Sequence, residues 1–156
     1  QPLDLYHQNR NEANGILRTL LGLYADYAPA PGLPDSPASS LLANAVFLIR
    51  SNFHHEYFHT EQLCQMLGVS RSTLYRAFQS ELNISPGEFL SNFRIHQACR
   101  LLELGNSVKT AAVSCGFSDA FYFSRAFRRR MGVSPSDYRR QPQKQDAGSE
   151  YSRLAF

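Results

Sequence analysis

Residues 124–135, SRAFRRRMGVSP, are similar to an earlier stretch of the same chain, YRAFQSELNISP at residues 75–86. Both stretches contain Arg-Ala-Phe, and in both an aliphatic residue and Ser-Pro follow after five further residues. Gly68 and Gly116 precede the two stretches at comparable distances. Two copies are too few for a solenoid, so the repetition predicts a tandem pair of similar units.

The punctuation of the chain by Gly, Pro and Ser predicts helices, and no alternation of β-branched and polar residues is long enough to predict a strand. Helices are expected over residues 41–51, 60–66, 70–82, 86–104, 107–114 and 118–131, with a last one opening at Ser134-Pro135. The expected N-caps include Thr60, Ser70, Ser107 and Ser118. Ser85-Pro86-Gly87-Glu88 has the capping-box arrangement with proline at the first helical position. The helix that it opens is expected to be about 19 residues, or ~28 Å, long.

Each copy is therefore expected to be a helix, a tight turn with glycine and a second helix. We predict an all-α fold of two helix-turn-helix subdomains joined by a long linker helix, and preceded by an N-terminal helix and a Pro-rich linker. Such an arrangement lets one helix lie across a nucleic-acid backbone while the next enters a major groove.

The expected domain organisation has three parts. Residues 1–40 would be a helix, with an apolar stripe at 3-4-3 spacing, and a Pro-rich linker, and would form the end of an upstream sensing or dimerisation domain. Residues 41–140 would be the helix-turn-helix domain, and residues 141–156 a flexible tail. The stripe consists of Leu17, Leu20, Tyr24 and Tyr27. The chain starts at Gln1, so we expect it to be a piece of a larger protein.

The composition limits the class of protein. The 156 residues are 43% hydrophobic, enough for a core, with no apolar run that predicts a membrane span and no leader that predicts secretion. Three widely spaced cysteines are expected to be reduced core residues, which favours the cytoplasm. The net charge of +3 is uneven, because residues 107–140 carry seven Lys and Arg against two Asp, a net charge of +5. This end of the molecule is suited to an anionic partner.

The second helix of each copy is expected to bury one face and expose the other. Leu74 and Phe78 in the first copy, and Phe123 and Phe127 in the second, lie four residues apart and are expected in the core, as are Phe89, Phe117 and Tyr138. The opposite faces carry Arg, which can bond guanine bidentately, and apolar groups, which can contact a thymine methyl. Contact with the major groove of duplex DNA is therefore expected.

The stretches GFSDAFYFSRAFRRRMGVSPSDYRR (116–140) and LGVSRSTLYRAFQSELNISPGEFLSNFRIHQACRLL (67–102) resemble the AraC/XylS family of bacterial transcription regulators. The first of them resembles the signature of that family, and the second its first helix-turn-helix and linker helix. The resemblance covers residues 41–140. It implies a gene activator or repressor that binds double-stranded DNA in the bacterial cytoplasm, associated with the nucleoid.

The resemblance also implies site residues. The predicted base-reading residues are Arg71, Ser72, Tyr75, Arg76, Ala120, Phe121, Ser124 and Arg125. The predicted phosphate contacts are Ser70, Arg94, Lys109, Ser118, Arg128, Arg129 and Arg139. The chain departs from the family pattern at Ala111, where the family usually has a larger aliphatic residue. Because Ala120 and Phe121 offer no side-chain hydrogen bond, readout by the second copy is expected to rest more on phosphate and methyl contacts.

Other functional classes fit the sequence less well than DNA binding does. The group His54, His55, His59 and Cys64 fits no closed zinc-site spacing, so no metal is predicted. No cofactor and no enzyme activity are predicted either, because no nucleophile or phosphate-loop context occurs. A helical protein-interaction module without a DNA role remains the alternative, although it would be expected to expose apolar anchors rather than an Arg-lined helix. Contact with RNA polymerase, and homodimerisation through residues 1–27 or an upstream domain, stay open.

Overall fold

The computed structural model describes residues 37–140, so the expected N-terminal helix with its apolar stripe at residues 17–27 and the expected tail at 141–156 lie outside the described residues. Within the described part, every element is a helix and none is a strand, which confirms the all-α prediction. The helices are α2 (Pro37–Asn52), α3 (Thr60–Leu67), α4 (Arg71–Leu82), α5 (Pro86–Glu103), α6 (Val108–Ser114), α7 (Ala120–Met131) and α8 (Pro135–Arg140).

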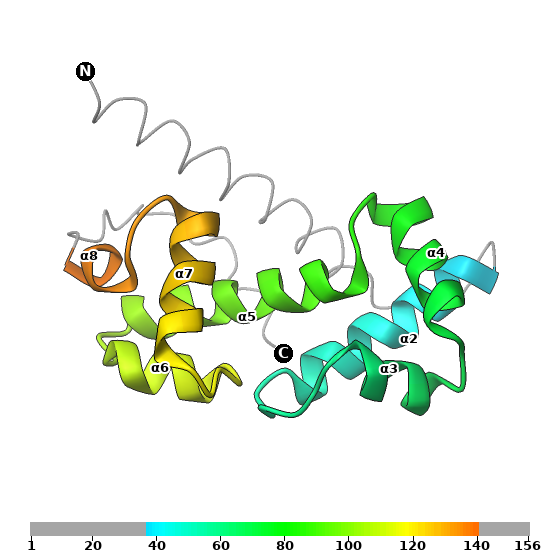
Figure 1. The fold of residues 1–156 in the computed structure, drawn as a ribbon, viewed down its shortest axis with the longest axis horizontal. Coiled ribbons are helices and arrows are strands. Elements are labelled where there is room, and N and C mark those ends of the chain that lie inside the picture. Colours follow the sequence, from blue (N-terminus) through cyan, green and yellow to red (C-terminus); the bar gives the residue numbers. More distant parts are fainter. Residues whose placement is uncertain (1–36, 141–156) are drawn as a thin grey trace, which may run out of the picture.

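The helices form two groups at the ends of α5. Figure 1 shows α5 crossing the middle of the molecule, with α2, α3 and α4 at one end and α6, α7 and α8 at the other. Each group has its own hydrophobic core, and α5 contributes to both. Phe89, Leu90 and Phe93 belong to the first core, and Ile95, Ala98, Cys99 and Leu102 to the second. The linker helix is therefore part of both subdomains, because it buries side chains in each core.

The predicted core aromatics are buried. Phe78, Phe123 and Phe127 have no exposed surface, and neither does Leu74. Phe89, Phe117 and Tyr138 are each at most 5% exposed, and the Tyr138 hydroxyl donates to Glu103 at 2.6 Å. Aromatic rings contact one another through the second core, and Phe127 lies edge-on to Tyr138 with 5.4 Å between ring centroids. The exposed and buried faces of α4 and α7 are those expected from their sequence spacing, except that Ser124 is half-buried.

The capping box that opens α5 is present. The N–H of Glu88 donates to the Ser85 hydroxyl at 3.2 Å, and the N–H of Ser85 donates to the Glu88 carboxylate at 3.1 Å. The bonds from the Ser85 backbone and hydroxyl lower the pKa of Glu88 below its ordinary value. The sequence Ser-Pro-Gly-Glu therefore determines where this helix starts.

Three helix starts differ from the sequence-based expectation. Helix α2 begins at Pro37 rather than Leu41, because proline is compatible with the first turn of a helix, where its missing N–H has no partner to lose. The N-cap of α3 is His59, not Thr60, and its N–H donates to Gln62 at 3.0 Å. The N-cap of α7 is Asp119, not Ser118, and it accepts from the N–H of Tyr122 at 2.8 Å.

The cap at Asp119 changes the alignment of the two copies. Ser70 caps α4 and Asp119 caps α7, so Ser70 corresponds to Asp119 and not to Ser118, the cap expected from the sequence. The second copy has one additional residue in the turn after Gly116. Both capped helices have 12 residues and then match position by position, so Ser72 corresponds to Phe121 and Arg76 to Arg125.

Phe127→Ala is expected to unfold the second subdomain. The ring has no exposed surface, and truncating a buried Phe costs about 3–5 kcal/mol, a large share of the stability of a small domain. Thermal or urea unfolding followed by circular dichroism measures the effect. The control is Phe121→Ala, in the same helix and 82% exposed, which should leave the midpoint unchanged. An unchanged midpoint for Phe127→Ala would contradict the packing of this core.

Candidate nucleic-acid interface

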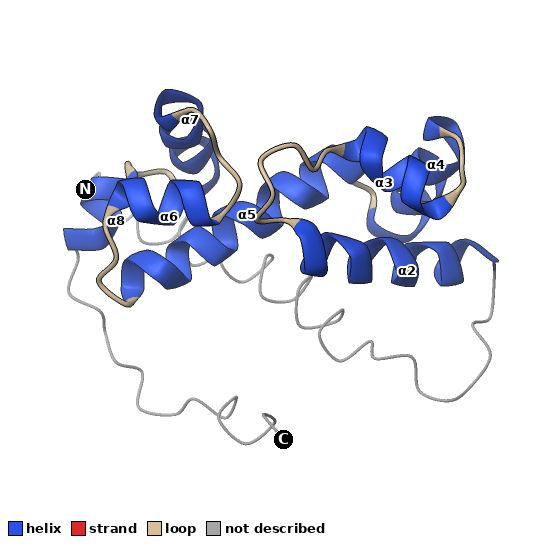
Figure 2. Ribbon diagram, turned by 90° about the horizontal axis from the view of Figure 1, so that it is seen from below, coloured by secondary structure: helices blue, strands red, loops and turns tan. Residues whose placement is uncertain are grey.

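The second helices of the two copies lie on one face of the molecule. Figure 2 shows α4 and α7 on the upper side of α5, with α2 on the opposite side. Their N-terminal turns are held by side-chain caps from Ser70 and Asp119, and their C-terminal ends by left-handed residues, Asn83 at φ 55° and Gly132 at φ 76°. Two helices of equal length, each packed by one face against its own core, therefore lie on the same side of α5.

The exposed face of α4 carries the predicted first base-reading set. Arg71, Ser72, Tyr75 and Arg76 are all exposed. Arg71 forms an ion pair with Glu61 of α3 at 3.3 Å, which holds its guanidinium beside the preceding helix. Arg76 has no ion pair within 4.0 Å among residues 37–140. The exposed guanidinium of Arg76 is thus available for an external acceptor.

The exposed face of α7 carries a different set. Ala120, Phe121 and Arg125 are exposed, and Ser124 is half-buried. The Phe121 ring is 82% exposed, the largest exposed fraction among the large apolar side chains of the described residues. Such a ring on a polar surface is suited to an apolar contact such as a thymine methyl. Arg76 and Arg125 therefore occupy equivalent positions on the two helices, but the exposed residues around them differ.

Most of the predicted phosphate contacts are at the surface. Ser70, Lys109, Ser118, Arg128, Arg129 and Arg139 are exposed. The Ser70 hydroxyl accepts from the N–H of Thr73 at 3.2 Å, and Arg139 donates to the Gly105 carbonyl at 3.3 Å. Arg130, the third of the adjacent arginines 128–130, pairs with Glu88 at 3.8 Å. The role of the exposed set in binding phosphate stays a prediction.

Arg94 does not lie where a surface phosphate contact would require it, and this prediction is corrected. The residue is 6% exposed and belongs to the buried part of α5. Its Nε donates to the carbonyl of Phe53 at 2.8 Å, and its Nη2 donates to the carbonyls of His55 and Phe58, both at 2.9 Å. Burial lowers the pKa of Arg94 below its ordinary value. An arginine retains its charge in this environment, and here it holds the loop between α2 and α3.

Arg94 also connects this loop to the second subdomain. Its guanidinium lies 5.9 Å from the ring centroid of Phe117, in the turn before α7. Gly116 adopts a φ of 76°, and a Cβ there would lie 2.5 Å from the Phe53 carbonyl oxygen and 3.0 Å from Nη2 of Arg94. Only glycine allows this approach. The loop of the first subdomain and the turn of the second thus meet at one buried arginine.

The Cys115 thiol lies near Arg94 and is buried. Burial raises the pKa of the Cys115 thiol to about 12, and the nearby charge of Arg94 acts against this rise. The thiol is therefore protonated at neutral pH and is a poor nucleophile or metal ligand. Among residues 37–140, no three His, Cys, Asp or Glu side chains form a group that could hold a metal ion. Within that range, no helix is long and apolar enough to cross a bilayer.

Residues 63–141 match a protein family described as a helix-turn-helix domain, and they make up half of the chain. The chain is also similar to the C-terminal domain of AraT, a response regulator from Geobacillus stearothermophilus. The TM-score is 0.64 and the identity 30%, over 74% of this chain and 99% of that one. The chain belongs to the AraC/XylS family of helix-turn-helix transcription regulators.

Further relatives extend the comparison. The DNA-binding domain of AdpA, a global transcriptional factor solved with a target DNA, has a TM-score of 0.57 and 32% identity, over 67% of this chain and 91% of that one. The raffinose operon regulatory protein RafR of Pediococcus pentosaceus is 44% identical over 79 residues, 50% of this chain and 28% of its own length. The Msm operon regulatory protein of Streptococcus mutans is 31% identical over 131 residues, 83% of this chain and 47% of its own length. The chain thus spans less than half of these two regulators.

Sequence reasoning missed the junction between the subdomains. Arg94 stands between Phe93 and Ile95 on a helix that is apolar on several faces, which is the signal that could have placed it inside. The contact of Gly116 with Phe53 joins residues 63 positions apart and has no local signature. The resemblance to the AraC/XylS family rests on local sequence motifs. The contact between Gly116 and Phe53 depends instead on how the two cores pack against each other.

Gly116→Ala is expected to destabilise the protein more than Gly105→Ala. Both glycines have positive φ, 76° and 85°, so each substitution costs about 1–2 kcal/mol of backbone strain. A Cβ at Gly105 has nothing within 4 Å, whereas at Gly116 it would meet the Phe53 carbonyl, which adds about 1–3 kcal/mol for overpacking. Urea unfolding of the two variants measures the difference. Equal destabilisation would contradict the close approach at the junction.

Proposed function

We propose that this chain is the DNA-binding part of a transcription regulator, and that it inserts α4 and α7 into two adjacent major grooves of one duplex. The observation that carries the proposal is the pair of matched 12-residue helices on one face, with Arg76 and Arg125 exposed at equivalent positions. Arginine at such a position can bond the O6 and N7 atoms of guanine. The similarity to the AdpA domain, solved with a target DNA, supports the same activity.

The exposed residues would divide into phosphate-contacting and base-reading groups. Arg128 and Arg129, one turn beyond Arg125, would neutralise phosphates and release counterions, which provides affinity without sequence preference. The N-terminal turns of α4 and α7 would supply backbone N–H groups to phosphate oxygens. Sequence preference would come from Ser72, Tyr75 and Arg76 on α4 and from different groups on α7.

The operator is expected to be asymmetric. Both recognition helices belong to one polypeptide and differ in their exposed residues, so no two-fold axis relates them. Helix α5 has 18 residues and is ~27 Å long, close to the ~34 Å between successive major grooves on one face of DNA. The two boxes should therefore lie about 10 base pairs apart.

The wider regulatory role is also a proposal. The two operon regulators compared above are more than twice as long as the matched part, so the remaining segments of a regulator of this kind would sense a signal or dimerise. We propose that the residues before α2, which begins at Pro37, link the helix-turn-helix domain to such a segment, and that residues 141–156 form a flexible tail. As a gene activator or repressor, the protein would act at the nucleoid in the cytoplasm, and an activator would also contact RNA polymerase.

Footprinting with this chain tests the proposed binding mode. After selection of its best sequence from random duplexes, one molecule per duplex should protect roughly 16–20 base pairs, with two unlike boxes about 10 base pairs apart. The stoichiometry is measured by titration at concentrations well above the Kd. Protection of a short palindrome, occupied only at two molecules per duplex, would contradict the model of two helices in adjacent grooves.

Arg76→Ala and Arg129→Ala should weaken binding in different ways. Loss of a bidentate base contact by Arg76→Ala should cost about 1–3 kcal/mol on the best site and relax preference at one base pair. Arg129→Ala should weaken all sequences about equally and reduce the slope of log affinity against log salt by about 1. Binding-site selection and salt titration separate the two. Relaxed base preference in Arg129→Ala alone would show that the roles are reversed.

A further inference from the structure

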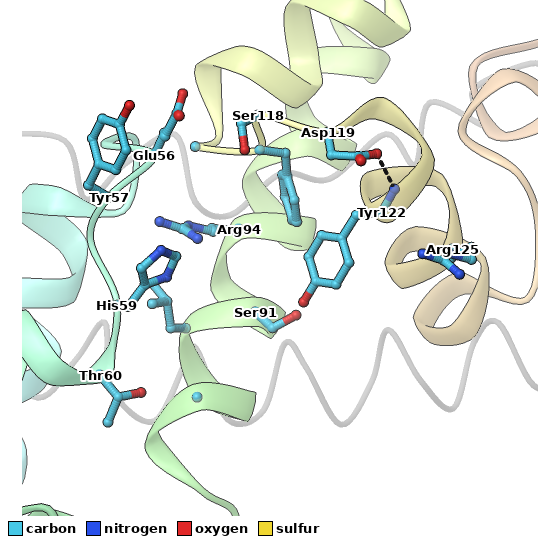
Figure 3. Close-up of a pocket in the computed structure, with 14 residues that line it drawn as sticks. Glu56, Tyr57, His59, Thr60, Ser91, Arg94, Ser118, Asp119, Tyr122 and Arg125 are labelled. Atoms are coloured by element: carbon cyan, nitrogen blue, oxygen red, sulfur yellow. Dashed lines mark hydrogen bonds between the residues drawn. The ribbon is translucent and has the colours of Figure 1, made fainter.

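A cleft of about 650 Å³ lies between the two subdomains. Its walls are the loop between α2 and α3 on one side and the start of α7 on the other, and α5 forms its floor. Figure 3 shows Tyr57 and His59 on the first wall, Ser118 and Tyr122 on the second, and Arg94 and Ser91 between them. The lining includes Arg125, which belongs to the exposed face of α7. The cleft is therefore continuous with the proposed DNA-binding face.

The loop that forms the first wall is held firmly. Arg94 bonds three of its backbone carbonyls, and the N–H of Phe58 donates to the carbonyl of His55 at 3.0 Å. On this anchored loop the Tyr57 side chain is 78% exposed. A tyrosine carried by an anchored backbone loses less conformational freedom on binding than one on a loose loop. The loop thus carries an exposed hydroxyl on the wall of the cleft between the two subdomains.

The floor of the cleft is positively charged. The buried guanidinium of Arg94 is bonded to neutral carbonyls, and it has no carboxylate within 4.0 Å among residues 37–140. Arg125 adds a second positive charge on the wall. The lining also contains two carboxylates, which lie on the walls and not beside Arg94: Asp119, which accepts from the N–H of Tyr122 as the N-cap of α7, and Glu56, which is exposed to solvent. Buried charge without a counterion favours an anion close to it.

We infer that this cleft binds the phosphodiester backbone of the DNA between the two boxes. The inference rests on the proposed function, because the cleft faces DNA only if α4 and α7 occupy adjacent grooves. The hydroxyls of Tyr57, Ser118 and Tyr122 would donate to phosphate oxygens, while Arg94 acts through its charge and not by contact. Such contacts fix the register of the two helices on the duplex and carry no base information.

The test uses two versions of the selected duplex. In one, all linkages are natural; in the other, the phosphates midway between the boxes are replaced by uncharged methylphosphonates. Binding of the wild-type chain is compared with that of Tyr57→Phe and Tyr122→Phe, which remove only a hydroxyl. Phe47→Ala, an exposed aromatic of α2 that does not line the cleft, is the control. Circular dichroism melting verifies that each variant folds like the wild type.

On the natural duplex each hydroxyl deletion should weaken binding by about three- to tenfold, as expected for the net loss of one hydrogen bond at a site open to solvent. On the methylphosphonate duplex the wild type should already be weakened, and neither deletion should weaken it further. The control should bind both duplexes like the wild type.

Losses of equal size on both duplexes, or no loss on the natural duplex, would overturn the inference while leaving the proposed function standing. Absence of any sequence-specific binding by the wild-type chain would overturn the proposed function, and this inference with it. The two failures are distinguishable because only the second abolishes sequence-specific binding to the two boxes.

Discussion

The buried guanidinium of Arg94 is the interaction on which the arrangement of the two subdomains depends. It satisfies three carbonyls of the loop between α2 and α3, and it lies beside Phe117 and Gly116 of the second helix-turn-helix. Desolvating an arginine is costly, and the hydrogen bonds offset that cost only when all partners are in place. The loop, the linker helix and the second turn are therefore held together, and the angle between α4 and α7 does not depend on α5 alone.

This junction gives the proposed activity its geometry. Each subdomain has its own core, and with α5 alone between them, rotation about that helix would move α7 relative to α4. Phe53 packs against both cores and its carbonyl contacts Gly116, so such rotation would break close packing. A protein of this kind would hold its two recognition helices nearly fixed, and much of the adjustment needed to fit both grooves would fall on the DNA.

The candidate interface could be predicted in part. Exposed positions on α4 and α7 follow from helical spacing, because burial of Leu74, Phe78, Phe123 and Phe127 determines which faces remain outside. The correspondence of Arg76 with Arg125 could also be predicted, because both belong to the repeated Arg-Ala-Phe. The cap at Asp119 was not, since Ser118 and Asp119 are both good capping residues and only the backbone decides between them. Arg94 was misplaced, because an isolated arginine is far more often a surface cation than a buried one.

The sequence by itself determined the local structure: where α5 begins, where the turns fall, and that two similar units follow one another. These features depend on residues close in the chain, through caps such as Ser85 with Glu88 and left-handed residues such as Gly116. Only the tertiary structure decided that α4 and α7 share one face, that Arg94 is buried, and that a cleft opens between the subdomains. Those features come from contacts between residues 36 to 63 positions apart, whose energy depends on packing and desolvation that no local pattern encodes.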